Sequence, residues 1–204
     1  MSLRHSYTLI APFYDAFLSA ATRGARRRSL AALNVPPARD VLLVGVGTGL
    51  DIAHVPAHHR YTGLDLTHAM LQRAQRKPAP AVVRLVEGDA QAMPFADHSF
   101  DAAVLHLILA VVPHPGRCLA EAARVVRPGG LLLVFDKFLH PGEPGRWKRA
   151  LNPLVRHVAT RLDVVFEDAL RHAPSLERQA DEPALAGGWF RLIRLRKAEP
   201  REVR

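Results

Sequence analysis

The chain has 204 residues, a length that fits one α/β domain able to bury about 70% of its unfolded surface. It contains no run of about 18 apolar residues and no charged-then-apolar leader, which argues against a spanning helix and a secretory signal and predicts a cytoplasmic protein. Lys and Arg number 28 against 19 Asp and Glu, so attraction to nucleic acid or an anionic membrane is expected, unless the host is simply arginine-rich.

The first 35 residues are predicted to form a helical segment in front of the core. Apolar residues between Leu9 and Ala21 recur at helical spacing, and Pro12 suits the first turn of that helix. A cationic cluster, Arg23 to Arg28, follows, and a second short helix from Ser29 to Leu33 is expected after it. We expect residues 1–204 to form a single domain, with the core at 36–136 and a less regular last third at 137–204.

The stretch VLLVGVGTGL, residues 41–50, joins an apolar run to a glycine-rich turn. The apolar run indicates a buried parallel strand. Glycine allows positive φ and close approach of a ligand, and a short helix at 50–54 would direct free N–H groups over the turn. A dinucleotide fingerprint would need its third glycine at Leu50, so NAD is not expected. The candidate contacts in this cradle are Gly45, Val46, Gly47 and Gly49.

Two further strand ends are predicted to meet this turn. The strand at 61–65 ends in Asp65, whose carboxylate is placed to accept hydrogen bonds from both ribose hydroxyls of an adenosine. The strand at 82–86 leads into Gly88, Asp89 and Ala90, where the acid is placed to receive the adenine amino group. The candidate contacts on this side are Asp65, Leu66, Met70, Asp89 and Ala90.

The alternation of helices and strands continues beyond these motifs. Thr67 is expected to cap a helix over His68–Arg76, in which Met70 would either pack on adenine or fill the core. The next predicted elements are a strand over Phe100–Leu109, a helix over 115–126, a turn at 127–130 and a strand over Leu131–Phe135. This order implies a parallel sheet with right-handed crossovers, and strand candidates at 176–179 and 189–195 would complete an antiparallel edge.

Residues 147–162 form a basic amphipathic pattern with Trp147 near its start. Such a pattern is typical of an interfacial membrane helix, and it equally fits a helix packed on the domain surface. The single cysteine, Cys118, excludes an internal disulfide and is expected to be structural. No H-x-x-H pair or Cys/His cluster occurs among the eleven histidines, so no metal is expected.

Taken in order, these motifs resemble the series found in class I S-adenosylmethionine (SAM) dependent methyltransferases. The matching stretches are Gly45–Gly49, Asp65, Gly88–Ala90, Met93–Asp101 and Arg127–Gly130. The sequence MPFADHSFD at 93–101 resembles the branch that holds the ubiquinone/menaquinone C-methyltransferases and the bacterial phosphatidylethanolamine N-methyltransferases. The phospholipid enzymes are favoured by Ser6–Tyr7, Ala11–Asp15, Val111–Pro113 and Leu151–Leu154.

The resemblance implies a Rossmann-like doubly wound sheet, SAM as the cofactor and an N-terminal helical lid. Tyr7 and Tyr14 would close over the methionine end of the cofactor from this lid. Families of this kind commonly carry an acid two residues before the first glycine, where this chain has Leu43. Without this acid, weaker binding of the methionine end of SAM is expected. The departure also leaves a non-enzymatic alternative open, in which a chain with the SAM fold has lost cofactor binding and serves as an interaction module.

Methyl transfer from a sulfonium is an in-line displacement, so an enzyme gains most by aligning the acceptor and excluding water. An amine acceptor must be neutral to attack, and a lysine-like amine has a pKa of about 10.4 in water, so desolvation or a nearby base is needed. His106 and Tyr14 are the candidate catalytic residues. The alternative for His106 is a core histidine bonded to a backbone carbonyl.

Several acceptor classes fit the chain. N-methylation of phosphatidylethanolamine and its methylated intermediates explains the N-terminal motif and the basic segments together, with an anionic membrane surface as partner and a peripheral location at the inner membrane. C-methylation of a quinone ring and N-methylation of a small soluble amine are the alternatives. Specific binding of nucleic acid is not expected, because Leu107-Ile108-Leu109 stands where base-amine methyltransferases carry a polar-Pro-Pro-aromatic motif. No oligomeric state is predicted.

Overall fold

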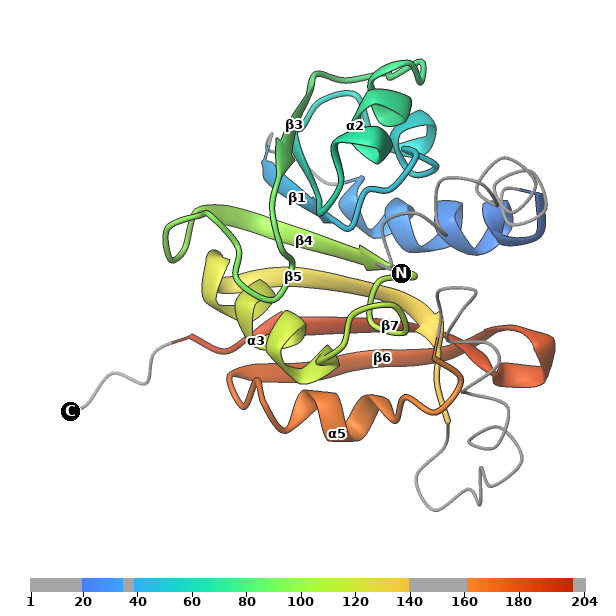
Figure 1. The fold of residues 1–204 in the computed structure, drawn as a ribbon. Helices are drawn as coiled ribbons and strands as arrows, with labels where there is room; N and C mark the ends of the chain where they lie inside the picture. The colour runs from blue at the N-terminus through green and yellow to red at the C-terminus, as the bar shows by residue number, and fades with distance from the viewer. Residues whose placement is uncertain (1–19, 35–38, 140–160, 200–204) are drawn as a thin grey trace, which may run out of the picture.

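The computed structural model describes residues 20–34, 39–139 and 161–199. Its centre is a seven-stranded sheet in the order β3-β2-β1-β4-β5-β7-β6 (Figure 1). The strands are β1 (Asp40–Val44), β2 (Arg60–Asp65), β3 (Val83–Glu87), β4 (Phe100–His106), β5 (Val126–Lys137), β6 (Leu176–Leu185) and β7 (Phe190–Lys197). The helices are residues 20–30, η1 (Ala31–Leu33), η2 (Ile52–His54), α2 (His68–Gln75), α3 (Pro115–Val125), α5 (Phe166–Leu170) and η4 (Ala186–Gly188).

Strands β1 to β5 pair in parallel, and β7 runs antiparallel to both β5 and β6. The predicted Rossmann-like sheet with an antiparallel C-terminal edge is therefore confirmed. In such a sheet the carboxyl ends of the parallel strands lie along one edge, and a ligand binds in the crevice beyond them. The ends of β1, β2, β3 and β4 thus define where a site must form.

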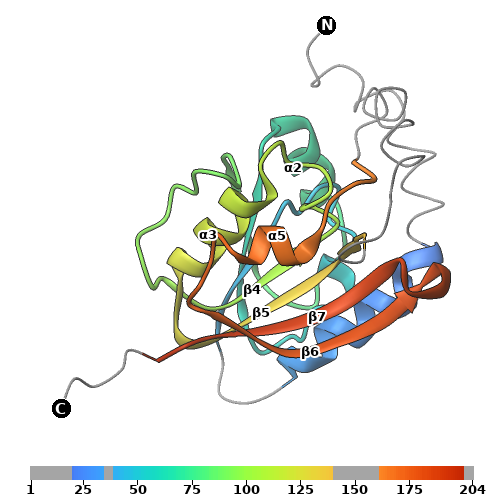
Figure 2. The ribbon, with the colours of Figure 1, turned by 90° about the horizontal axis from the view of Figure 1, so that it is seen from below.

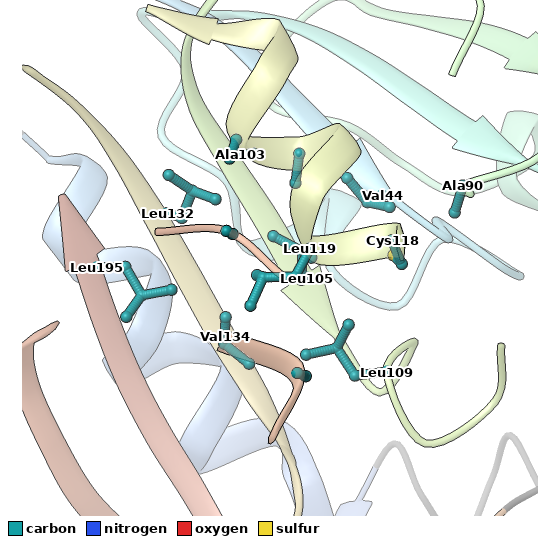
Figure 3. Packing of buried hydrophobic residues seen from close by; sticks show 14 of the residues in the cluster. Val44, Ala90, Ala103, Leu105, Leu109, Cys118, Leu119, Leu132, Val134 and Leu195 are labelled. Atoms are coloured by element: carbon teal, nitrogen blue, oxygen red, sulfur yellow. The ribbon is translucent and has the colours of Figure 1, made fainter. Parts of the chain in front are cut away.

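The sheet separates two apolar layers because successive side chains of a strand point to opposite faces. In β1, Val41 and Leu43 pack with Leu30 and α2 on one face. Leu42 and Val44 pack with α3 and α5 on the other face. Figure 2 shows α3 and α5 on the same side of the sheet, and Figure 3 shows Val44 near Cys118 and Leu119 of α3. Both layers are buried, which explains why the β1 segment reads as an unbroken apolar run.

Cys118 belongs to the layer that contains α3, and it has no exposed surface (Figure 3). Burial raises the pKa of its thiol to about 12. The thiol therefore stays protonated at neutral pH and packs as a small apolar side chain, in line with the structural role predicted for it.

The structure corrects three predicted boundaries. Helix 20–30 is continuous, so the cationic cluster lies inside a helix and does not separate two helices. Strand β4 ends at His106, because Leu107 turns into a left-handed conformation with φ of 59°. The segment 127–130 does not precede β5 but lies inside it as an irregular bulge, because Val126 pairs with Phe100 and Leu131 with Ala102, which leaves these four residues opposite Asp101 alone.

Two predicted features of the chain lie wholly or mostly outside the described residues. The apolar part of the N-terminal helix and the lid tyrosines fall within residues 1–19, and most of the basic amphipathic segment falls within 140–160. In the part of the chain that the structure describes, no helix is long and apolar enough to cross a membrane.

Candidate cofactor site and acceptor site

The glycine turn follows β1 directly and adopts a conformation that favours glycine. Gly45, Gly47 and Gly49 have φ of 65°, 56° and 81°. The Val46 N–H donates to the Leu64 carbonyl at 2.9 Å, which ties the turn to β2. The predicted turn is therefore confirmed in position and in backbone geometry.

The three glycines differ in what surrounds them. A Cβ on Gly45 would lie 2.5 Å from Ile108 Cδ1, and one on Gly49 would lie 3.0 Å from the backbone of Ala74. Among the described residues, a Cβ on Gly47 would meet nothing closer than a carbonyl oxygen at 3.9 Å. Gly45 and Gly49 are thus required by packing, whereas Gly47 leaves open space beside the main chain where a ligand can approach.

Asp65, at the end of β2, reaches across to this turn. Its Oδ2 accepts a hydrogen bond from the Gly47 N–H at 2.9 Å, and its Oδ1 accepts from the Thr67 N–H at 3.0 Å and the Thr67 hydroxyl at 3.2 Å. Burial raises the pKa of Asp65, and the Thr67 and Gly47 hydrogen bonds partly offset that shift. Thr67 is the N-cap residue of α2, as predicted, but its hydroxyl bonds Asp65 and makes no capping hydrogen bond to the helix.

The predicted adenine side lies at the ends of β2 and β3. The Gly88 N–H donates to the Asp65 carbonyl at 2.9 Å, so the two strand ends are joined. Leu66 is a large apolar residue with 51% exposure, whereas Met70 and Ala90 are buried. The Asp89 carboxylate accepts from the Gln91 backbone N–H at 2.8 Å. Leu66 is thus the exposed apolar surface of this side, and Met70 also contributes to the core.

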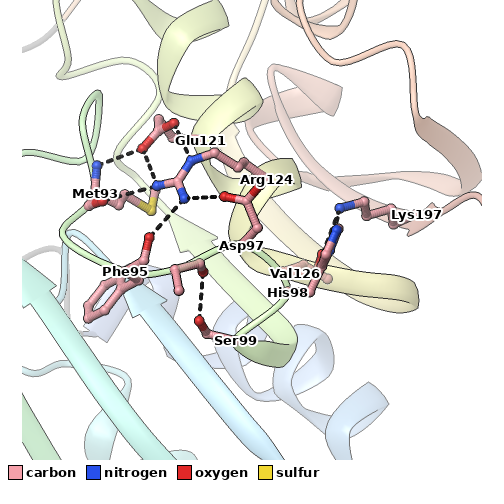
Figure 4. A network of polar contacts seen from close by, with 10 residues as sticks. Met93, Phe95, Asp97, His98, Ser99, Glu121, Arg124, Val126 and Lys197 are labelled. Carbon is pink, nitrogen blue, oxygen red and sulfur yellow. Dashed lines mark hydrogen bonds and ion pairs between the residues drawn. The ribbon is translucent and has the colours of Figure 1, made fainter.

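A network of polar contacts holds the loop that carries the MPFADHSFD motif against α3 (Figure 4). Arg124 donates to the carbonyls of Met93 and Phe95 at 3.0 and 2.8 Å, and it pairs with Asp97 and Glu121. The Met93 N–H donates to Glu121 at 2.7 Å. The motif therefore has a structural role, because these contacts fix the loop that follows Asp89.

His106, the predicted polar group of the acceptor pocket, lies at the end of β4 with no exposed side-chain surface. Its Nδ1 lies 2.8 Å from Asp51 Oδ1, and its Nε2 lies 2.9 Å from Ser29 Oγ. The ring therefore bonds two side chains and not the backbone carbonyl that the sequence offered as the alternative. Its catalytic role remains a prediction, as do the roles of Tyr7 and Tyr14, which lie outside the described residues.

Asp51 and Arg26 are residues that sequence reasoning missed. Arg26 Nη1 lies 2.7 Å from Asp51 Oδ2, and the two side chains are 7% and 10% exposed. Burial alone would raise the pKa of Asp51, but Arg26 and His106 outweigh it and hold this pKa far below its usual range. A lone acid between apolar neighbours, directly after the glycine turn, was the available signal for Asp51.

The segment after β4 lies beyond the carboxyl end of that strand and is held by contacts with other segments. Its Ala110 N–H donates to Asp136 Oδ2 at 2.9 Å, and its Ala110 carbonyl accepts from the Arg161 N–H at 2.6 Å. Burial raises the pKa of Asp136, which backbone N–H groups partly offset. Ile108 from the same segment packs on Gly45, so this segment and the glycine turn are in direct contact.

The residues around the turn fit the adenosine part of SAM. Asp65 supplies a carboxylate at the strand tip, Gly47 leaves the main chain open, and Leu66 offers an apolar face for the base. The Thr48 hydroxyl is buried in the turn with no hydrogen-bond partner among the described residues. Within that same part of the chain, no group of three or more side chains could hold a metal ion.

Comparison with known proteins agrees with this geometry. A methyltransferase domain family matches residues 42–134. A phosphatidylethanolamine N-methyltransferase from Cereibacter sphaeroides is 32% identical, covering 90% of this chain and 92% of the relative. A demethylmenaquinone methyltransferase from Renibacterium salmoninarum is 36% identical, covering 65% of this chain and 56% of the relative. A fatty-acid O-methyltransferase from Mycolicibacterium smegmatis is 33% identical, covering 74% and 57%.

Solved structures share the fold at low sequence identity. A SAM-dependent methyltransferase from Thermotoga maritima superposes with a TM-score of 0.68 at 21% identity, covering 95% of this chain and 98% of that one. Another from Mesorhizobium loti gives 0.65 at 19% identity, covering 87% and 98%. These similarities support the fold independently of the sequence relatives.

Proposed function

The chain belongs to the SAM-dependent methyltransferases, and we propose that its acceptor is the amine of phosphatidylethanolamine and of its methylated intermediates. The observation that carries this proposal is the share of each chain over which the relatives match. The phosphatidylethanolamine enzyme matches over nine tenths of both chains, whereas quinone methyltransferases match over 51% to 75% of their own length and the fatty-acid enzyme over 57%. A shared acceptor site is best supported where the acceptor-side segments match as well as the cofactor core.

In this proposal, each part of the cofactor site has a role. SAM supplies a methyl group on a positively charged sulfur. Asp65 would hold the ribose hydroxyls, Gly47 would allow the cofactor to lie against the main chain, and Leu66 would cover the base. On the acceptor side, the segment fixed by Asp136 and Ile108 would hold the amine in line with the methyl group and keep water out.

The acceptor is tested by presenting labelled SAM with phosphatidylethanolamine vesicles, a demethylated quinone and a small soluble amine in parallel. We expect transfer to phosphatidylethanolamine at least tenfold faster than to the other two. Faster transfer to the quinone would contradict the proposal and favour the alternative acceptor.

We further propose that helix 20–30 contacts the membrane that holds this acceptor. Arg23, Arg27 and Arg28 are exposed on this helix, and Arg28 also donates to the Pro183 carbonyl. Arg26 was predicted to belong to the cationic surface, but its ion pair with Asp51 buries it. The basic surface of this helix is therefore narrower than the sequence indicates.

Binding to anionic vesicles should depend on this surface. A cation near an anionic bilayer gains about 1 kcal/mol, so Arg23→Gln with Arg27→Gln should weaken binding by up to about 30-fold at low salt. Vesicle co-sedimentation measures the change. Arg76→Gln with Lys77→Gln is a matched control, because it removes the same charge from exposed residues just after α2. An equal loss in the control, or equal binding to neutral vesicles, would argue against docking through helix 20–30.

A further inference from the structure

Two elements that border the cofactor turn, helix 20–30 and β4, meet at one buried carboxylate. Asp51 lies two residues after Gly49, and each of its two oxygens has its own partner: Arg26 from helix 20–30 and His106 from the end of β4. Helix 20–30 adds a third link, because Ser29 Oγ lies 2.9 Å from His106 Nε2. Arg26 also donates from Nε to Thr22 Oγ1 at 3.1 Å, which fixes the guanidinium along its own helix.

The order Asp51, His106, Ser29 has the distances of a nucleophilic relay, but burial excludes that role in this conformation. The bonded side chains of Asp51, His106 and Ser29 are enclosed by the protein: the His106 side chain is fully buried and Ser29 is only 8% exposed. A nucleophile needs an open path to its substrate. The chain of bonds instead joins elements that are far apart in sequence, since Arg26 precedes Asp51 by 25 residues and Ser29 precedes His106 by 77.

The bonding pattern also fixes how these elements can move. Because the pKa of Asp51 is held low, its carboxylate can only accept, so His106 Nδ1 donates to Asp51 Oδ1, and His106 Nε2 shares a second hydrogen bond with the Ser29 hydroxyl. Arg26 and Asp51 are each buried, so separating them would leave an unpaired charge in the interior. Helix 20–30 therefore cannot leave the glycine turn without breaking the ion pair, and Asp51 cannot shift without moving its contact to β4.

We propose that Asp51 is a positioning residue for methyl transfer, through which helix 20–30 and the end of β4 are held on the cofactor turn as one unit. Because coupling between two sites is reciprocal, a ligand that orders the turn must also stabilise helix 20–30. This role of Asp51 rests on the proposed SAM site at the glycine turn. It does not depend on which acceptor the enzyme methylates.

The test compares Asp51→Asn with the double variant Arg26→Met, Asp51→Asn. The single variant leaves Arg26 buried without a counter-charge and should lower the melting temperature, whereas removing both charges of a buried pair is often neutral for stability. Hydrogen exchange of residues 20–30 is measured with and without S-adenosylhomocysteine, and calorimetry gives the Kd of the same ligand. Neither measurement requires a methyl acceptor, so both stay informative if the phospholipid proposal is wrong.

In the wild-type protein we expect S-adenosylhomocysteine to slow exchange in helix 20–30 at least tenfold. The double variant should recover a melting temperature near that of the wild type but lose this protection and bind the ligand at least tenfold more weakly. Recovery of both protection and affinity together with stability would overturn the proposal, because the pair would then be structural only.

Ser29→Ala provides a second test that spares the ion pair. It removes only the link between helix 20–30 and His106, so the fold should persist while the ligand-dependent protection falls at least threefold. Full protection in Ser29→Ala would overturn the joint role of Asp51 and His106 even if the double variant failed to fold.

Discussion

Replacing Asp65 by alanine is expected to weaken SAM binding by about 1 to 3 kcal/mol, or roughly 5- to 150-fold, the cost of losing hydrogen bonds to a charged acceptor. Asp65 ends β2 and bonds the Gly47 N–H at 2.9 Å, so its carboxylate lies beside the open space of the turn. Calorimetric titration with SAM measures the loss.

Two further variants separate lost contacts from lost structure. Asp65→Asn keeps the shape of the side chain and removes its charge, so it should bind SAM more weakly than the wild type while the turn stays intact. Glu182→Ala removes an exposed acid from β6 and should leave affinity unchanged. Wild-type affinity in Asp65→Ala would mean that the ribose is held elsewhere.

The parts of the fold that could be predicted are those set by local pattern. Val41 to Val44 read as a buried strand because both faces of β1 are covered, and the glycines mark the turn because their backbone has positive φ. Asp65 could be placed because the carboxyl ends of neighbouring parallel strands meet at one edge of the sheet. None of these steps required knowledge of how distant segments dock.

The features that could not be predicted depend on such docking. Arg26 reads as part of an exposed cluster, and only the packing of helix 20–30 on the turn brings it to Asp51. The end of β4 depends on Leu107 adopting positive φ, which is uncommon for a branched apolar residue and has no marker in the sequence. The bulge in β5 contains the proline and glycines that are typical of a turn, so the sequence predicts the bend in the chain but not that the strand begins before it.

Replacing Gly47 by alanine is expected to impair SAM binding through two separate effects. An L residue at φ of 56° costs about 1 to 2 kcal/mol of backbone strain, which lowers stability. The added methyl group would also occupy space that the bound cofactor is proposed to fill, and crowding of space that is already filled typically costs about 1 to 3 kcal/mol. SAM affinity should therefore fall roughly 5- to 150-fold beyond any loss of folded protein.

The turn before β7 contains a matched control for the strain. Gly187 has φ of 65° and no described residue within 4 Å of an added Cβ, so Gly187→Ala carries a similar backbone cost in the β6–β7 connection, outside the glycine turn. Both variants should lose a similar amount of stability in thermal unfolding, but only Gly47→Ala should lose affinity in titration with SAM. If both variants bound SAM equally well, the space beside Gly47 would not be the place where the cofactor lies.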